Sequence, residues 1–221
     1  IRTLKQQDCD AVVYAGMVKR PDFSSLKVDW RGAALLPKII AAAARGDGAI
    51  LNVLVETLEA EGLLVIGADE ICEDAACETG AIGVLSPRAE HFADIRKAAA
   101  IVHALGPFDV GQGAVVANGF VVAVEAAEGT DAMLERCATI ANDASRGGVL
   151  VKRPKPAQEL RIDLPVIGAE TVRRAGEAGL AGIAVEAGRA IIIDRAETAA
   201  LADKLGLFVY GFSARDLAGD A

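Results

Sequence analysis

Three short segments of this chain carry more polar residues than their apolar surroundings require, and the first is EAAEGTDAML at 125–134. It leaves an apolar run and enters a helical pattern, with Thr130 or Asp131 in place for an N-cap. An exposed helix N-terminus can bind phosphate, and Glu125 and Glu128 would then hold a cation beside it. The structural alternative is a plain cap whose acidic neighbours are favoured by the helix dipole. The segment alone leaves both interpretations open.

The second segment, GGVLVKRPKP at 147–156, places three basic side chains directly after a strand pattern. Lys152, Arg153 and Lys155 follow the strand end, and open α/β sheets bind ligands at the carboxyl ends of their strands. The two prolines stiffen this loop. A solvated basic loop is the structural alternative, but local positive charge in a chain of net charge −8 favours a phosphate ligand.

The third segment, RIDLPVIG at 161–168, surrounds one carboxylate with apolar residues. Asp163 lies between Ile162 and Leu164, and a carboxylate in such company is partly desolvated unless it binds a partner. This environment makes it a candidate metal ligand or general base. Pairing with Arg161, or acceptance of a backbone N–H, is the structural alternative.

The elements that must position these segments alternate between strand-like apolar runs and helical patterns. Such alternation predicts an α/β fold, with mostly parallel sheets and helices on their faces. Asn118-Gly119 is a strong turn signal between the two strands of a hairpin. The expected strands are 11–15, 63–66, 115–116, 120–126, 149–152, 182–186, 190–194 and 207–210. The expected helices are 31–45, 49–61, 90–105, 130–141, 171–178 and 197–204.

A change of character at 69–87, which is acidic and weakly patterned, predicts the boundary between two domains. We expect an N-terminal α/β domain at 1–83 and a C-terminal, catalytic α/β domain at 84–221, each with a mostly parallel or mixed sheet and flanking helices. The chain begins at Ile1 within a helical pattern, so we expect a further segment, with the first strands of the N-terminal domain, to precede it.

The composition argues against several classes of protein. Apolar residues make up 52% of the 221 residues, which is typical of a globular core, and the excess of acidic residues argues against nucleic-acid binding. No apolar stretch approaches the ~20 residues that span a bilayer. Two histidines and four cysteines without a CxxC pair argue against a zinc cluster and favour a reduced, cytosolic chain. No Walker A, GxGxxG or GxSxG motif is present, and Gly111-Gln112-Gly113 alone predicts only a turn.

Together, the three segments resemble the UDP-2,3-diacylglucosamine pyrophosphatases of the LpxI type. The likeness extends to four further segments and so covers nearly the whole chain. These segments are AGLAGIAVEAGRAIIIDR at 178–195, AGMVKRPDF at 15–23, GDGAIL at 46–51 and DVGQGAVV at 109–116. The resemblance implies two α/β domains with the ligand in a cleft between them. Family members carry an N-terminal α/β segment ahead of the point where this chain begins.

The resemblance implies a hydrolase that acts in lipid A biosynthesis at the cytoplasmic side of the inner membrane. UDP-2,3-diacylglucosamine and water would give UMP and 2,3-diacylglucosamine 1-phosphate (lipid X), with attack of water expected at the sugar-side phosphate. The partner is then a lipid-linked sugar nucleotide, with transient contact to the inner membrane surface, no nucleic acid, and a homodimer expected. The apolar helix at 33–44 is one candidate wall for the acyl chains, although an ordinary core helix is the favoured interpretation of it.

The resemblance also assigns residues. The family's essential aspartate lies in an R-x-D-L-P motif, so Asp163 is the expected catalytic residue. Hydrolysis of a pyrophosphate needs a metal to neutralise the phosphates, basic groups to hold them and a carboxylate to activate water. The cation is expected to be Mg²⁺ or another divalent ion, with Asp163, Glu125, Glu128 and Asp131 as candidate ligands. The expected substrate-binding residues are Lys152, Lys155, Gln158, Arg161, Thr130 and Gly129. We expect the turn at 128–131 to lie within reach of Asp163.

Two other functions stay open at this point. One is a non-catalytic α/β module that binds a sugar nucleotide or lipid, with the acidic residues acting as caps. Metal-dependent release of UMP would distinguish the enzyme from such a module. The other is a nicotinamide-dependent oxidoreductase, which parallel strands alone suggest. The absence of a glycine-rich turn from strand to helix argues against it.

Overall fold

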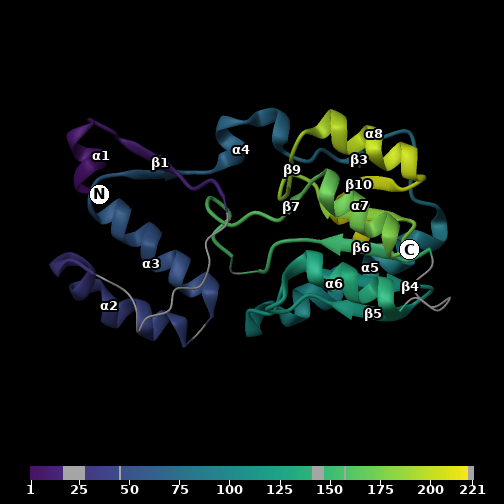
Figure 1. The fold of residues 1–221 in the computed structure, drawn as a ribbon, viewed down its shortest axis with the longest axis horizontal. Helices are drawn as coiled ribbons and strands as arrows, with labels where there is room; N and C mark the ends of the chain where they lie inside the picture. The colour runs from purple at the N-terminus through teal and green to yellow at the C-terminus, as the bar shows by residue number, and fades with distance from the viewer. Residues whose placement is uncertain (17–27, 45, 141–146, 157, 219–221) are drawn as a thin grey trace. The chain divides into compact units, whose positions relative to one another are not determined.

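The computed structural model describes residues 1–16, 28–44, 46–140, 147–156 and 158–218 (Figure 1). The chain divides into two compact units. Unit 1 contains Ile1–Ile71 together with Gln158–Asp163, and unit 2 contains Cys72–Ala157 and Leu164–Ala221. The division at Ile71 lies inside the segment expected to be a linker, and before the boundary expected after residue 83. Part of the resembling segment at 15–23 lies outside the described residues.

Unit 1 is built on a two-stranded parallel sheet, in which Ala11 pairs with Leu64 and Val13 with Ile66. Its core consists of Val55 and Leu58 from a helix and of Leu63 and Val65 beside it in the sheet. The strands predicted at 11–15 and 63–66 and the helix predicted at 49–61 are therefore confirmed. The elements are α1 (Arg2–Gln6), β1 (Ala11–Val13), α2 (Trp30–Ala43), α3 (Asp47–Ala60), β2 (Leu64–Ile66) and α4 (Ala68–Ile71).

The helix α2 corrects one expectation, because it is not an ordinary core helix. Asp29 caps it by accepting a hydrogen bond from the Gly32 N–H at 2.8 Å. Of its described residues Ala42 alone is buried, while the Trp30 side chain is 77% exposed. The core of unit 1 is supplied instead by α3 and the strands, so the apolar composition of α2 did not predict its burial.

Unit 2 contains a six-stranded sheet in the order β3-β10-β8-β6-β4-β5. The three central strands are parallel, and β3, β4 and β5 are each antiparallel to their neighbours, so the sheet is mixed as predicted. The strands are β3 (Gly80–Ala81), β4 (Gly113–Ala117), β5 (Phe120–Val124), β6 (Val149–Lys152), β8 (Gly182–Glu186) and β10 (Phe208–Phe212). A second, two-stranded parallel sheet pairs β7 (Val166–Ile167) with β9 (Ile191–Ile192).

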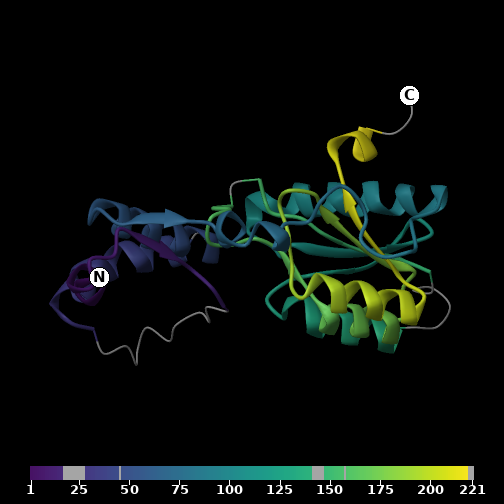
Figure 2. The ribbon, with the colours of Figure 1, turned by 90° about the horizontal axis from the view of Figure 1, so that it is seen from above.

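Helices cover both faces of the large sheet, and the alternation of side chains along each strand explains why (Figure 2). Ala114 and Val116 of β4 pack toward α5, whereas Val115 packs toward the opposite core with α6 and α7. A strand between two helical layers must be apolar on both faces, which is why the central strands read as continuous apolar runs. The helices are α5 (Ala89–Leu105), α6 (Gly129–Ile140), α7 (Ala169–Glu177), α8 (Arg195–Leu205) and α9 (Ala214–Ala218), with 3-10 turns η1 (Glu73–Ala75) and η2 (Gly106–Phe108).

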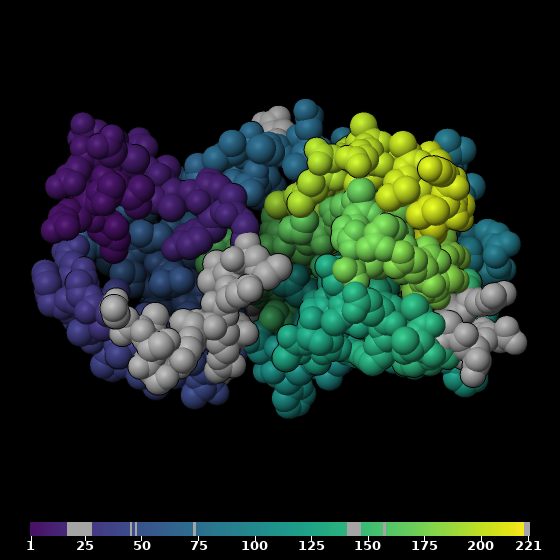
Figure 3. All heavy atoms as spheres, in the orientation of Figure 1, coloured from purple at the N-terminus to yellow at the C-terminus, as the bar shows by residue number. Residues whose placement is uncertain are grey.

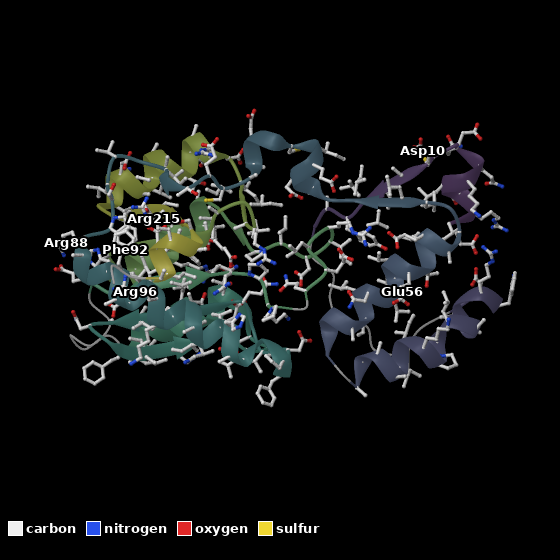
Figure 4. All side chains as sticks on the ribbon, turned by 180° about the vertical axis from the view of Figure 1, so that it is seen from behind. Asp10, Glu56, Arg88, Phe92, Arg96 and Arg215 are labelled. Carbon is white, nitrogen blue, oxygen red and sulfur yellow. The ribbon has the colours of Figure 1, made fainter. Side chains whose placement is uncertain are left out.

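Figure 4 shows the protein from the side opposite to that of Figure 1, and it labels Arg88, Phe92, Arg96 and Arg215. The Arg96 guanidinium donates to the Asp216 carbonyl at 3.5 Å and so connects α5 to the last helix. Among the described residues, no helix is long and apolar enough to cross a membrane.

Candidate functional site

The carboxyl ends of the parallel strands in unit 2 gather charged residues at one edge of the sheet. Lys152 ends β6 opposite Val185 of β8, and on its other side it pairs with Gly113, where β4 begins. The end of β5 joins the same edge, because the Glu125 N–H donates to the Gly113 carbonyl at 2.9 Å. We call the resulting group the charged edge; it consists of Asp109, Glu125, Lys152, Arg153, Lys155 and Glu186.

The basic loop after β6 is not a solvated surface loop. Lys152 is only 7% exposed and donates from Nζ to the Val166 carbonyl at 3.1 Å. Lys155 forms an ion pair with Asp109, and the side chains of the two are 12% and 19% exposed. Both lysines are therefore held inside unit 2 at the carboxyl edge, where ligands of open α/β sheets bind. Their direct contact with substrate stays a prediction.

Sequence analysis did not find two of the partners in the charged edge. Glu186 at the end of β8 places Oε2 2.9 Å from Arg153 Nε, and Oε1 3.2 Å from Arg189 Nη1. Asp109 is the partner of Lys155. Glu186 ends a buried strand that the sequence predicts, so the same strand-end argument that identified Lys152 would have found it. Asp109, which precedes β4, carries no such pattern.

Glu125 is held by groups from both of its flanking segments. Its Oε1 accepts from Thr130 Oγ1 at 3.1 Å, and its Oε2 accepts from the Gln112 N–H at 3.4 Å. The contacts of Glu125 explain the two glycines of Gly111-Gln112-Gly113. A Cβ on Gly111 would lie 2.1 Å from the Glu125 carbonyl oxygen, and a Cβ on Gly113 would lie 2.7 Å from Glu125 Oε2. Gly111 therefore permits the close approach of the Glu125 backbone, and Gly113 that of the Glu125 carboxylate.

The turn before α6 confirms a helix start and corrects its cap. The helix α6 begins at Gly129, whose φ of 79° suits glycine. Thr130 and Asp131 are thus inside the first turn, and the prediction that one of them is the N-cap is wrong. The Thr130 hydroxyl bonds to Glu125 instead. Glu125 and Thr130 are therefore brought together.

The other two carboxylates of this segment have arginine partners near the surface. Glu128 Oε1 lies 2.8 Å from Arg136 Nη2, and Asp131 Oδ1 lies 3.8 Å from Arg174 Nε. A hydrogen bond from its own backbone N–H, followed by the one from Arg136, holds the pKa of Glu128 below its usual range. The side chain of Asp131 is 58% exposed. Sequence proximity had grouped these two residues with Glu125, and the structure gives them different partners.

The segment Gln158–Asp163 belongs to unit 1. Ile162 packs against the unit 1 core, and Arg161 binds Glu59 at 2.6 Å and Glu159 at 2.7 Å. The hydrogen bonds from Arg161 lower the pKa of the Glu159 carboxyl. The Gln158 amide donates to the Asp163 carbonyl, and the Asp163 N–H donates to the Glu159 carbonyl at 3.1 Å. The ion pairs of Arg161 are with glutamates rather than with Asp163. That Asp163 meets the charged edge stays a prediction, since the two lie in different units.

Comparison with known proteins identifies the family. A model described as the LpxI N-terminal domain matches residues 1–75, and one described as the LpxI C-terminal domain matches residues 78–210. The UDP-2,3-diacylglucosamine pyrophosphatase LpxI of Caulobacter vibrioides is 50% identical over 216 residues, which cover 95% of this chain and 77% of that protein. The chain belongs to the LpxI family.

Membership of the LpxI family confirms the two-domain α/β fold and makes the chain a hydrolase of the pyrophosphatase class. The non-catalytic module and the nicotinamide-dependent oxidoreductase are thereby set aside. At the charged edge, Lys152, Arg153 and Lys155 are held in place by partners within the protein.

The carboxylate oxygens of this chain are the kind of donor that Mg²⁺ takes in proteins. In the part of the chain that the structure describes, no three His, Cys, Asp or Glu side chains are grouped so as to hold one metal ion. Mg²⁺ is commonly bound by one or two carboxylates together with substrate phosphates, so a three-carboxylate cage is not required. Glu128 and Asp131 have arginine partners, and Glu125 accepts hydrogen bonds from Thr130 and Gln112.

Proposed function

We propose that this enzyme hydrolyses UDP-2,3-diacylglucosamine to UMP and 2,3-diacylglucosamine 1-phosphate, in lipid A biosynthesis. The observation that carries the proposal is the 50% identity, over 95% of the chain, to the Caulobacter protein that is named for that activity. The geometry that supports it is the charged edge, since a diphosphate needs several fixed cations and unit 2 holds Lys152, Arg153 and Lys155 at one strand end.

The reaction as proposed needs one base and one anion site. Asp163 takes a proton from water, whose oxygen forms a bond to the sugar-side phosphorus. The bond between this phosphorus and the bridging oxygen breaks, and the bridging oxygen leaves with UMP. Lys155 stabilises the charge on the phosphates, and Lys152 fixes the strand end from which the basic loop begins. Gly129, Thr130, Gln158 and Arg161 are the further substrate-binding residues of the proposal.

The role proposed for Asp163 agrees with its local environment. It follows Ile162, which packs against the unit 1 core, and it precedes Leu164 and the buried Pro165. Apolar neighbours restrict the water around a carboxylate and so strengthen its interaction with one bound water molecule. Its backbone is fixed by the hydrogen bond to Glu159 and by the bond from the Gln158 amide.

A divalent cation, with Mg²⁺ as the expected one, would neutralise the phosphates in this site. Asp163 and Glu125 would hold it together with phosphate oxygens, and Glu128 and Asp131 are the remaining candidates from the sequence. The substrate carries two acyl chains, so we further propose transient contact with the cytoplasmic surface of the inner membrane. A homodimer completes the proposal.

The deciding experiment measures UMP release from UDP-2,3-diacylglucosamine by the purified protein, with and without EDTA. We expect turnover that EDTA abolishes and added Mg²⁺ restores. Turnover that is insensitive to EDTA would contradict the metal requirement alone. Binding of the substrate without UMP release would contradict the proposed reaction.

A further inference from the structure

We propose that Arg153 and Arg189, connected by Glu186, form a two-arginine site for a phosphate group at the carboxyl ends of β6 and β8. Arg153 and Arg189 would contact the anion, and Glu186 would be the positioning residue between them. The inference rests on the proposed function for its ligand, a diphosphate ester. We call this group the arginine clamp.

The first support is the position of the arginine clamp in the sheet. Arg153 follows β6 directly, and Glu186 ends β8, the parallel neighbour of β6. Ligands of open α/β sheets bind outside the carboxyl ends of the strands. Both arginines thus start from the edge at which Lys152 and Lys155 also lie.

The second support is the rigidity of the backbone that presents the two arginines. The Arg153 N–H donates to the Gln112 carbonyl at 3.0 Å. The turn from Glu186 to Arg189 is fixed by hydrogen bonds from Ala187 to Phe212 at 2.9 Å and from Gly188 to Cys77 at 2.7 Å. Gly188 adopts a φ of 69°, which lets the chain reverse there. A site fixed before the ligand arrives loses less entropy when it binds.

The third support is that the two carboxylate oxygens of Glu186 each contact a different arginine. Oε2 lies 2.9 Å from Arg153 Nε, and Oε1 lies 3.2 Å from Arg189 Nη1. The Arg153 Nε and Glu186 Oε2 atoms are buried, and their contact lacks the alignment of a hydrogen bond. One carboxylate between two guanidinium groups leaves a net charge of +1, which suits an anion.

The contacts of Arg153 leave part of its guanidinium for a ligand. Nε faces Glu186, and Nη1 donates to the Ala99 carbonyl at 3.5 Å. A guanidinium has five N–H donors in a planar fork, so N–H groups on the two Nη atoms exceed these contacts. Phosphate oxygens match that fork. The Arg189 side chain is 40% exposed, which leaves it accessible from the same turn.

The fourth support is energetic. The side chains of Arg153 and Glu186 are 14% and 16% exposed. A buried ion pair loses solvation that its mutual attraction barely restores, so it is a weak source of stability. Anion binding would explain why a pair with so small a net stabilisation is kept, because a desolvated guanidinium attracts phosphate more strongly than a hydrated one.

The variants Arg153→Lys and Arg189→Lys test the proposal, because each removes the planar guanidinium group and keeps the positive charge. Steady-state UMP release gives KM and kcat, and calorimetry with inorganic pyrophosphate gives a dissociation constant without turnover. We expect KM and the pyrophosphate dissociation constant to rise about tenfold to a hundredfold in Arg153→Lys, the range for one charge-assisted hydrogen bond. We expect a smaller rise in Arg189→Lys, because its side chain is more exposed.

Glu186→Gln tests the positioning role, because the amide is isosteric but no longer attracts both arginines. We expect the same two constants to rise by about threefold to tenfold, with kcat changed less, and Glu186→Asp to recover part of the loss. Arg173→Gln, an exposed arginine on α7, is the matched control and should change neither constant. If Glu186→Gln melts early, the two lysine variants still decide the proposal.

The outcomes separate this inference from the proposed function. Wild-type KM and pyrophosphate affinity in both lysine variants would overturn the arginine clamp. A protein that binds pyrophosphate through these arginines, yet releases no UMP from UDP-2,3-diacylglucosamine, would keep the clamp and overturn the proposed reaction.

Discussion

Unit 2 contains two groups of paired charges that differ in burial and place. The charged edge lies at the strand ends, where the pairs Arg153–Glu186 and Lys155–Asp109 have side chains less than a fifth exposed. The second group lies on α6 and α7, two helices that Figure 3 shows at the surface by their teal and green colours. We call it the α7 network; it consists of Arg173 and Arg174 with Glu170, Glu177, Glu135 and Asp131.

This difference in burial shows that the number of ion pairs in a group does not indicate the role of that group. Exposed pairs gain modest attraction in water and are screened by salt, with a typical value of about 0–1 kcal/mol. Removing one partner of a buried pair leaves an uncompensated charge, which has a much larger effect. We therefore propose a functional role for the charged edge and for Asp163, and only a small contribution to stability for the α7 network.

The largest effect is expected for Asp163→Asn, which keeps the size of the side chain and removes the base. Turnover should fall by at least ~10²-fold, the low end for loss of a general base. The melting temperature should change little, and substrate binding should survive because the acyl chains and the uridine are unaffected. UMP release and thermal melting on the same preparation test this. A variant that melts early but hydrolyses substrate normally would contradict the catalytic role.

A substantial effect on both activity and stability is expected for Lys155→Ala. Loss of one charge-assisted phosphate contact should lower kcat/KM about tenfold to a hundredfold. Asp109 would also be left without its ammonium partner, so the free energy of unfolding should fall by ~1–3 kcal/mol. The double variant Lys155→Met/Asp109→Asn should recover stability and not activity. Recovery of both stability and activity in the double variant would show that Lys155 has a structural role and does not bind phosphate.

A graded effect is expected across the three carboxylates of the 125–131 segment. Glu125→Gln should raise the Mg²⁺ concentration needed for half-maximal activity by about tenfold, the value of one charge-assisted contact. Glu128→Gln and Asp131→Asn should change it less than about twofold, since their arginine partners are near the surface. Mg²⁺ titrations of the three variants measure this. Equal effects in all three would restore the grouping that the sequence suggested.

The smallest effect is expected for the pH dependence of the α7 network. Hydrogen bonds from Arg173 and Arg174 hold the pKa of Glu170 below its ordinary value of 4.5. A lowered pKa means that the stabilisation is present above 4.5 and is lost as the pH falls through the folded-state value. Arg173→Gln should therefore lose less stability on acidification than the wild type does. Denaturant unfolding between pH 7 and pH 3 measures it, and parallel curves for both proteins would contradict it.

Local patterns predicted most of the fold. The hairpin of β4 and β5 follows from Asn118-Gly119, both of which adopt positive φ, and β6 and β8 follow from apolar runs of strand length. The expected strand at 190–194 is only the two-residue β9, and β3 and β7, of equal length, were not predicted. Strands this short have no period of their own and depend on pairing with distant residues, as Gly80 does with Gly211.

The candidate site was predicted in its residue types and less well in its pairings. Glu125 and Thr130 lie close in sequence, and the Thr130 hydroxyl donates to the Glu125 carboxylate. Arg174 reaches Asp131 from another helix, and Arg153 meets Glu186 across two parallel strands. Such contacts are set by the strand order of the sheet, which no local period encodes.

The excursion of Gln158–Asp163 into unit 1 has a consequence for how the chain is made. A ribosome that has finished α4 must still synthesise β3 to β6 before Arg161 can bind Glu59. At ~5–20 residues per second this delay is roughly five to twenty seconds. During it, the nascent unit 1 lacks the packing of Ile162 against its core and the ion pair between Arg161 and Glu59. The N-terminal half of this enzyme therefore completes its folding only after much of the C-terminal half has been synthesised.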